Sequence, residues 1–449
     1  MTLSSGETAA VSVPSLGIGR YLLAAVVGVE ATSSFQISPN VVNQGEIDLP
    51  DSFKTTPEAA IRELERRLAL HGMPNVDGSG PNASVIASIT VGDIRNFYIT
   101  AYGSVATTTA YPNNFIKARC VGVSDQLYIY VDTSIVSPDY GLVSDIRLKF
   151  EEGIAASVRD AYGNEPAKGP DNDTHLTILL TNAMREGIIG LFYGADLYGN
   201  NPLDIQLRES NTRKIIYVRY SSSGLTDVVR YGTIAHEFQH MVNFYQKRLA
   251  MNGFEETWLA EGQAKYAEDI AGYGISAGDA NTAQIIKMMQ AQAAFNNMSL
   301  TTWYGIESYG LSYLFVRFLA EANRYGTTSR EITRALSTST RVGYRAIEAI
   351  TNEPFSRTLG RFYLSLLLNR YTSTVSGDYG IKGLNLSGTN AGVQLIGMPV
   401  TTIGGSAIST DVKGHGCRYF RRDGNVGETT LQLQNVVNRV QAWLLDQRP

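Results

Sequence analysis

The feature that most constrains this chain is a long helical pattern over residues 226–249, with two histidines near its middle. They belong to HEFQH, residues 236–240, which is an HExxH sequence. Residues four apart lie one turn apart on one face of an α-helix, so both imidazoles can reach a single metal ion. Apolar neighbours such as Phe238 and Val242 predict that this helix runs through a core.

The HExxH sequence meets the minimal requirement of a zinc hydrolase. We expect His236 and His240 to bind Zn²⁺, which lowers the pKa of a bound water and polarises a carbonyl group. Glu237 stands beside them and can take the proton of that water. The alternative is a pair of hydrogen-bonded core histidines with Glu237 on a solvated edge. With five histidines in 449 residues, this arrangement rarely arises by chance.

Catalytic zinc sites use three protein ligands, so two histidines leave one ligand to be found. Glu261, in the run WLAEG at 258–262, fits this role because it opens the next helical run. Gly253 provides a turn between the two helices. The apolar residues before Glu261 place it on a buried approach, whereas the alternative is a surface glutamate such as Glu255 or Glu256.

Composition excludes several classes of protein. Apolar residues make up 43% of the chain, which is enough for a real core. The net charge of −4 and the absence of a Lys/Arg-rich run leave a nucleic-acid role without electrostatic support. No stretch reaches the roughly 18 apolar residues that a membrane helix needs. The N-terminus lacks the features of a secretion signal, so the protein is either cytosolic or a mature form with an added Met1.

Element patterns divide the chain into three expected regions of an α+β protein. Residues 1–135 are mainly short strands, interrupted by one helix between Thr56 and Gly72. Residues 136–375 alternate strands and helices and then become helical, and this region, which contains the HExxH sequence, is the expected domain of the zinc hydrolase. Residues 376–449 return to short β-like runs with glycines.

Individual elements and the two cysteines give further expectations. Predicted strands are 84–91, 96–101, 127–132, 176–181 and 214–220, and residues 144–162 form a predicted helix. Cys120 and Cys417 are too far apart in sequence for a CxxC site. They are either one long-range disulfide or two buried thiols.

At HEFQHMVNF followed by WLAEG, the sequence resembles the glutamate-type zinc metallopeptidases, the gluzincins. Within them it is most similar to the hyicolysin family of secreted bacterial neutral metallopeptidases. The similarity spans roughly residues 85–400. Within this range several runs match the family pattern in the same order: NFYI, LYIYVD, LTILLT, GLFYGADLY, KIIYVRY and SYGLSYLFVRFLAE. It implies a zincin-like domain, with a mixed sheet over the active-site helix and a helical lower lobe.

The resemblance also implies roles for particular residues. His236, His240 and Glu261 become zinc ligands, and Glu237 becomes the general base and acid. The resemblance also implies that the protein is secreted or located on the cell surface. Ala260 replaces the Asn that often precedes the third ligand. The absence of a GxMEN-type sequence favours an endopeptidase over an aminopeptidase.

Two supporting roles remain to be filled. In the thermolysin-like branch an Asp four residues after the third ligand orients a histidine, but Lys265 stands here. Glu268 or Asp269 is the candidate orienter, unless both lie on a solvated face. Related enzymes stabilise the oxyanion with a Tyr or His from a later helix, and we choose Tyr309, at the start of an apolar helix.

The leading hypothesis is a zinc endopeptidase that cleaves protein or peptide substrates. An edge strand at 190–198 or 214–220 would bind the extended substrate. The alternatives are an adhesion or binding protein with a vestigial zinc site, and an exopeptidase on the same scaffold. The charged stretches 62–67 and 171–173 are expected to be solvated faces or loops.

Overall fold

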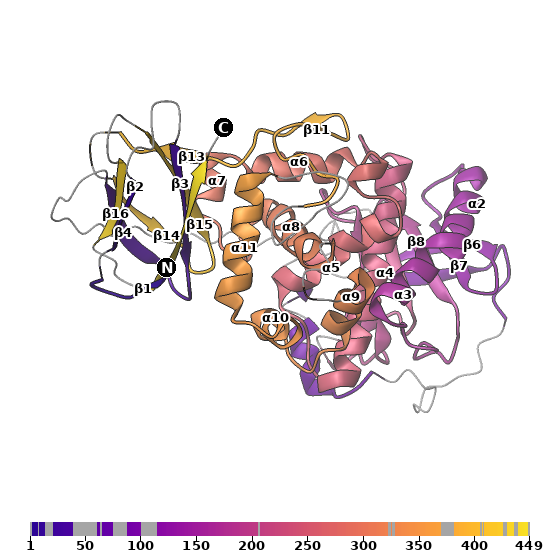
Figure 1. Cartoon of the computed structure of the whole chain (residues 1–449). Coiled ribbons are helices and arrows are strands. Elements are labelled where there is room, and N and C mark those ends of the chain that lie inside the picture. Colours follow the sequence, from indigo (N-terminus) through magenta and orange to yellow (C-terminus); the bar gives the residue numbers. More distant parts are fainter. Residues whose placement is uncertain are drawn as a thin grey trace. The chain divides into compact units, whose positions relative to one another are not determined.

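The computed structural model contains two compact units (Figure 1). The central unit comprises Thr55–Asn281 and Thr327–Ala346, and the terminal unit comprises Met1–Lys54, Thr282–Gly326 and Ile347–Pro449. The structure describes residues 2–7, 9–13, 21–38, 61–62, 65–74, 88–99, 115–204, 207–321, 325, 328–369, 381–404, 406, 408–424, 429–434 and 439–447. The mixture of helices and sheets is the one expected from the sequence. The units divide the chain differently from the three consecutive regions proposed above, since strands from both ends share one unit.

A six-stranded mixed sheet organises the central unit, in the order β5-β6-β7-β8-β10-β9. β7 pairs in parallel with β8, and β8 with β10, whereas the other pairs are antiparallel. β7 and β8 are buried along their whole length, which explains their continuous apolar sequences. The strands are β5 (Ile94–Tyr98), β6 (Phe115–Val123), β7 (Leu127–Asp132), β8 (Leu176–Thr181), β9 (Gly190–Leu191) and β10 (Ile215–Arg219).

The predicted strands at 127–132, 176–181 and 214–220 are confirmed as β7, β8 and β10. The strand predicted at 96–101 overlaps β5 up to Tyr98, and residues 100–101 lie outside the described residues. Residues 84–87 also lie outside them, and 88–91 form no strand. The N-terminal helix is confirmed in part, because residues 61–62 and 65–67 are helical and η1 (Leu68–His71) ends at Gly72.

The longest helix, α4 (Asp227–Met251), has local signals at both of its ends. The Thr226 hydroxyl caps its start by accepting a hydrogen bond from the Val229 backbone N–H. Asn252 ends it in the left-handed conformation, which Asn adopts more readily than most residues. A short connection then leads to α5 (Thr257–Ile270), which packs beside α4.

Further helices cover α4. Residues 140–162 form α2 (Tyr140–Lys149), a π-helical turn η2 (Phe150–Ile154) and α3 (Ala155–Tyr162), close to the single helix predicted. The Phe150 ring packs edge-on against Phe238 of α4, with ring centroids 5.1 Å apart. The central unit also holds α9 (Ser329–Thr338). η2, α3, α5 and α9 pack against α4 and help to keep most of it out of water, so polar side chains on its inner face need specific partners.

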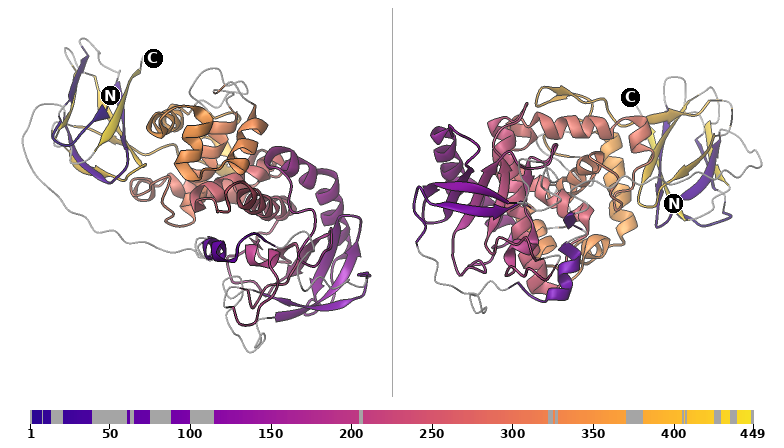
Figure 2. Two further views of the ribbon diagram at one scale, coloured as in Figure 1. Left: turned by 90° about the horizontal axis from the view of Figure 1, so that it is seen from below. Right: turned by 180° about the vertical axis from the view of Figure 1, so that it is seen from behind.

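Strands from the two ends of the chain interleave in the terminal unit. One sheet has the order β1-β17-β3-β15-β13, and the other has β14-β4-β16-β2. Figures 1 and 2 show the indigo N-terminal strands beside yellow C-terminal ones. The strands are β1 (Thr2–Leu3), β2 (Ala9–Val13), β3 (Tyr21–Gly28), β4 (Ser33–Ser38), β13 (Val400–Thr402), β14 (Ile408–Val412), β15 (Cys417–Asp423), β16 (Thr429–Gln434) and β17 (Val440–Gln447).

The helices of the terminal unit come from the middle of the chain. They include α7 (Gln292–Phe295), α8 (Glu307–Glu321) and α11 (Phe355–Leu368), while α6 (Ala280–Met289) and α10 (Gly343–Thr351) cross the boundaries between units. A short hairpin of β11 (Thr389–Asn390) and β12 (Val393–Gln394) follows. No helix in the described ranges is long and apolar enough to span a membrane.

The structure decides between the two expectations for the cysteines. Cys120 and Cys417 are both free, and both are buried. The long-range disulfide is therefore wrong, and the alternative of two buried thiols is confirmed. Burial raises the pKa of the Cys120 thiol to about 11, which makes it a packing residue with little thiolate character at neutral pH.

Candidate metal centre

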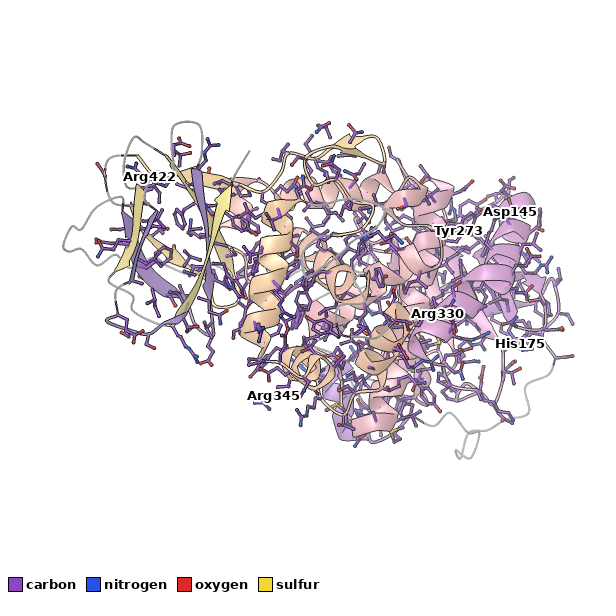
Figure 3. All side chains as sticks on the ribbon, in the orientation of Figure 1. Asp145, His175, Tyr273, Arg330, Arg345 and Arg422 are labelled. Atoms are coloured by element: carbon purple, nitrogen blue, oxygen red, sulfur yellow. The ribbon has the colours of Figure 1, made fainter. Side chains whose placement is uncertain are left out.

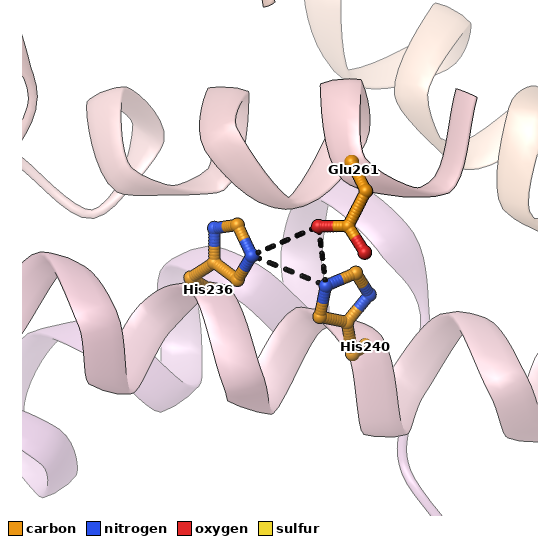
Figure 4. A group of neighbouring side chains, drawn as sticks. All are labelled: His236, His240 and Glu261. Atoms are coloured by element: carbon orange, nitrogen blue, oxygen red, sulfur yellow. Dashed lines mark hydrogen bonds and ion pairs between the residues drawn. The ribbon is translucent and has the colours of Figure 1, made fainter. Parts of the chain in front are cut away.

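Three side chains from α4 and α5 bring their ligand atoms to one point (Figure 4). Nε2 of His236 lies 3.1 Å from Nε2 of His240, and these nitrogens lie 3.3 and 3.2 Å from Oε2 of Glu261. Ligand atoms bound to one tetrahedral zinc ion lie about 3.3 Å from one another. The triangle therefore fits a metal without rearrangement, and its two imidazoles and one carboxylate match a catalytic zinc site.

The cluster is buried, which makes the charge of Glu261 the main electrostatic problem of the site. Glu261 is 1% exposed and His240 is 3% exposed. Burial alone would raise the pKa of Glu261, but its contacts with His240 and His236, together with the charge of Arg62, hold that pKa well below its usual range. The carboxylate is thus ionised and ready to bind a cation.

The two histidines differ in protonation when no metal is bound. Burial opposes the charged form of both rings. For His236, hydrogen bonds to Glu261 and Glu268 outweigh burial and raise the pKa to about 9. For His240, burial and the nearby Arg62 charge lower the pKa to about 3. One ring must therefore lose a proton when a metal binds, and the other is already neutral.

Glu268 is the carboxylate that orients His236. Its Oε1 lies 3.0 Å from Nδ1 of His236, which leaves Nε2 to face the cluster. Oε2 of Glu268 accepts a hydrogen bond from Nζ of Lys265 at 2.9 Å. Of the two candidates that the sequence offered, Glu268 rather than Asp269 has this contact. Lys265, at the position of the thermolysin-like aspartate, supports the orienting group instead of supplying it.

Two further residues of the site, Arg62 and Glu65, were expected on a solvated face, and this expectation is wrong. Arg62 is 9% exposed and Glu65 is 4% exposed. Nε of Arg62 donates to Oε1 of Glu261 at 3.1 Å. The sequence contains a weak indication that Glu65 is buried. It lies four residues after Ile61 and three before Leu68, which places it on the apolar stripe of that helix. The acidic stretch at 171–173 is a partly exposed loop, in which Asp173 pairs with His175. His175 is labelled in Figure 3.

Glu237 is buried where strand β9 meets α4. Burial raises its pKa to about 7, opposed by the charges of His236 and Arg62 and by the Phe192 backbone N–H. A Cβ atom at Gly190 of β9 would lie 2.8 Å from Oε1 of Glu237 and 2.3 Å from Cγ2 of Thr233. The close approach of strand and helix therefore requires glycine at position 190.

The sheet topology separates the two strands proposed to bind substrate. β10 pairs with both β8 and β9, so the run 214–220 is internal and its assignment as an edge is wrong. β9 has β10 as its only neighbour among the described strands, which makes 190–191 one edge of the sheet, opposite β5. The expected strand 190–198 is therefore right only for its first two residues, because Gly194–Leu197 form a 3-10 helix. A central position for 214–220 fits its nearly continuous apolar sequence.

A small cavity of about 30 Å³ borders the cluster. Its lining includes His240, Asn243 and Glu65. The side-chain amide of Asn243 has no hydrogen-bond partner among the described residues, although the residue is 3% exposed. The volume corresponds to about one water molecule, and the polar lining offers the partners that a buried water needs.

Tyr309 is part of α8 in the terminal unit, near the start of that helix. Its ring packs edge-on against Trp303, with centroids 4.8 Å apart, and it is partly exposed. Its role as oxyanion donor stays a prediction.

Comparison with known proteins shows that the chain is similar to metal-dependent peptidases. Residues 181–380 match the Peptidase M30 family, and this range contains His236, Glu237, His240 and Glu261. The chain is 26% identical over 262 residues to Neutral metalloprotease ShpI of Staphylococcus hyicus. That alignment covers 52% of this chain and 54% of ShpI, so the chain spans about half the length of its relative. The matches support a likeness to the hyicolysin-type metallopeptidases.

Proposed function

We propose that this protein is a zinc-dependent endopeptidase with a zincin-like catalytic domain. The observation that carries the proposal is the triangle of His236, His240 and Glu261 ligand atoms, 3.1–3.3 Å on a side, with Glu237 buried beside it. These three residues would hold the ion, which supplies Lewis-acid polarisation and lowers the pKa of a bound water.

Glu237 acts as the general base and then as the general acid. Its pKa of about 7 in the metal-free chain suits a group that accepts a proton near neutral pH and then releases it to the leaving amine. Glu268 holds the His236 ring in the tautomer that presents Nε2 to the cluster. The buried surroundings of Glu237 exclude water, which strengthens the electrostatic interactions of its carboxylate.

The free edge of β9 binds the extended substrate as an additional strand. Two observations support this assignment: β9 is one of the two edges of the central sheet, and its Gly190 lies against Glu237, whereas β5 forms the opposite edge. A peptide paired with an edge strand gains main-chain hydrogen bonds whatever its side chains are. This mode of binding places an internal stretch of the substrate beside the base, as an endopeptidase requires.

The resemblance to enzymes that stabilise the oxyanion with a Tyr or His from a later helix leads us to propose Tyr309 as the donor to the oxyanion of the scissile carbonyl. Tyr309→Phe removes only that hydroxyl and should lower kcat about 10²-fold, as loss of an oxyanion donor does in other hydrolases. Tyr304→Phe, a nearby tyrosine substitution, is the control. Equal activity of the two variants would remove Tyr309 from the site.

The resemblance to hyicolysin also leads us to propose a secreted or cell-surface location.

The function is tested by digestion of a peptide library with zinc-loaded wild type and with Glu237→Gln. We expect internal cleavages by the wild type and a loss of about 10²–10⁴-fold in rate for the variant. Zinc content of both proteins, measured by atomic emission, should be equal because Glu237 is not a ligand. Cleavage confined to chain ends would contradict an endopeptidase. Full activity of Glu237→Gln would contradict the proposed base.

A further inference from the structure

We infer that Arg62 is a positioning residue for the third metal ligand, Glu261, and this inference rests on the zinc site proposed above. The two oxygens of Glu261 have different partners. Oε2 lies 3.2 and 3.3 Å from the two imidazole nitrogens, whereas Oε1 accepts a hydrogen bond from Nε of Arg62 at 3.1 Å. Arg62 therefore determines which oxygen of the carboxylate faces the metal.

The chemistry of this pair explains how Arg62 acts. A carboxylate can bind a metal with one oxygen or with both. A guanidinium bound to Oε1 leaves Oε2 as the single ligand and fixes the plane of the carboxylate by a charge-assisted hydrogen bond. The pair is buried, with side-chain exposures of 9% and 1%, so water competes little for either partner. The positive charge also offsets part of the cost of burying Glu261.

Arg62 is itself held in place by Glu65. Nη1 of Arg62 donates to Oε2 of Glu65 at 2.5 Å, and Oε1 of Glu65 accepts from the backbone N–H of Gly194 at 2.8 Å. The guanidinium thus bridges two buried carboxylates. Gly194 follows strand β9 by only three residues, so the chain of contacts runs from the metal ligand to the segment after the proposed substrate strand.

The helix that carries Arg62 and Glu65 lies outside residues 181–380, the range that matches the Peptidase M30 family. The metal ligands and Glu237 all lie inside that range. A segment about 120 residues N-terminal to the matched range therefore completes the surroundings of the metal, which ties metal affinity to an element that the ligand motif does not contain.

The test is the zinc affinity of the full-length chain, measured by competition with a chromophoric chelator. The variants are Arg62→Gln, Arg62→Lys and, as a control, Arg67→Gln, an exposed arginine of the same helix. We expect Arg62→Gln to weaken zinc binding about 10–100-fold, as loss of an outer-shell partner typically does. The zinc affinity of Arg62→Lys should lie between those of Arg62→Gln and the wild type. Lysine keeps the positive charge, but its single ammonium group lacks the planar fork with which arginine bridges two carboxylates. Arg67→Gln should match the wild type.

Two further measurements separate positioning from a merely structural role. The visible spectrum of the Co²⁺-substituted protein should change in Arg62→Gln, because the carboxylate geometry changes. In the Glu261→Gln background, Arg62→Gln should have no additional effect on metal affinity, because Arg62 acts through Glu261. Thermal unfolding identifies the folded variants, and Arg62→Lys decides the question if Arg62→Gln does not fold.

Each remaining outcome overturns the inference in a distinguishable way. A folded Arg62→Gln protein with wild-type zinc affinity and an unchanged Co²⁺ spectrum would show that Arg62 only supports the fold, while the proposed function would stand. A wild-type protein that binds no zinc would refute the proposed function, and the inference would fail with it.

Discussion

Nδ1 of His236 lies 3.0 Å from Oε1 of Glu268, a residue one helix away and 32 positions later in the chain. This contact fixes the ring orientation that directs Nε2 toward His240 and Glu261. The second carboxylate oxygen of Glu268 is bound to Lys265, whose ammonium group also lies 3.8 Å from Asp279. A buried ionic chain therefore supports one metal ligand from behind.

Removal of the Glu268 charge should weaken the metal site more than it affects the fold. Glu268→Gln keeps an acceptor for His236 but loses the negative charge that strengthens the hydrogen bond, so we expect about 10–100-fold weaker zinc binding. Zinc competition measures this effect. Asp269→Asn, the adjacent and more exposed acid of α5, is the matched control and should retain wild-type affinity. Equal effects of the two substitutions would argue against a specific role for Glu268.

Position 190 should tolerate no side chain. In Gly190→Ala the new methyl group would meet Thr233 and Glu237, and we expect kcat to fall about 10²-fold because the base is displaced. Zinc affinity should stay close to that of the wild type. Thr233→Ser removes the methyl group that lies 2.3 Å from the new Cβ, so the double variant should recover part of the activity. Gly199→Ala, where a Cβ meets nothing within 4 Å, should have no effect, and a similar loss there would disprove the steric explanation.

Metal removal should destabilise the central unit. A ligand that binds only the folded state stabilises it by about 3 kcal/mol when its concentration is 100 times Kd. We therefore expect a chelator to lower the melting temperature measured by calorimetry, and zinc to restore it. His240→Ala should abolish the response to zinc, because it removes one of three ligands. An identical zinc response in wild type and His240→Ala would place the binding elsewhere.

Asp196 predicts a pH dependence of stability away from the metal site. Burial raises its pKa from 3.8 to about 7, even though the Asn211 backbone N–H and the Tyr217 hydroxyl donate to its oxygens. The folded chain therefore holds a proton that the unfolded chain has released between about pH 4 and pH 7. The contribution of Asp196 to the free energy of unfolding is therefore complete below about pH 4 and is lost as the pH rises through 7. The loss is at most roughly 4 kcal/mol.

Asp196→Asn tests this assignment. The amide keeps an acceptor oxygen and does not titrate, so the free energy of unfolding should vary less between pH 4 and pH 7 than in the wild type. Urea denaturation of both metal-free proteins across this range gives the comparison. Parallel stability curves for the two proteins would show that Asp196 does not titrate there.

Much of the metal centre could be predicted because its geometry is local. The spacing of His236 and His240 places both imidazoles on one face of any α-helix, and Thr226 and Asn252 determine where that helix begins and ends. The apolar run before Glu261 indicated a buried carboxylate on the following helix. The strands at 127–132 and 176–181 were predictable for a similar reason, since continuous apolar residues require burial on both faces of a sheet.

By itself, the sequence determined the residue types at the site and the helices that carry them, because these depend on neighbours within a few positions. Only the tertiary structure decided the partners. Arg62 and Glu261 form their hydrogen bond although they are 199 residues apart in the sequence. Glu268 rather than Asp269 reaches His236 because of the way α5 is rotated about its own axis where it packs against α4. The edge position of β9 likewise follows from strand order. Such contacts arise when distant segments bury their surfaces together, and periodicity within one segment carries no information about them.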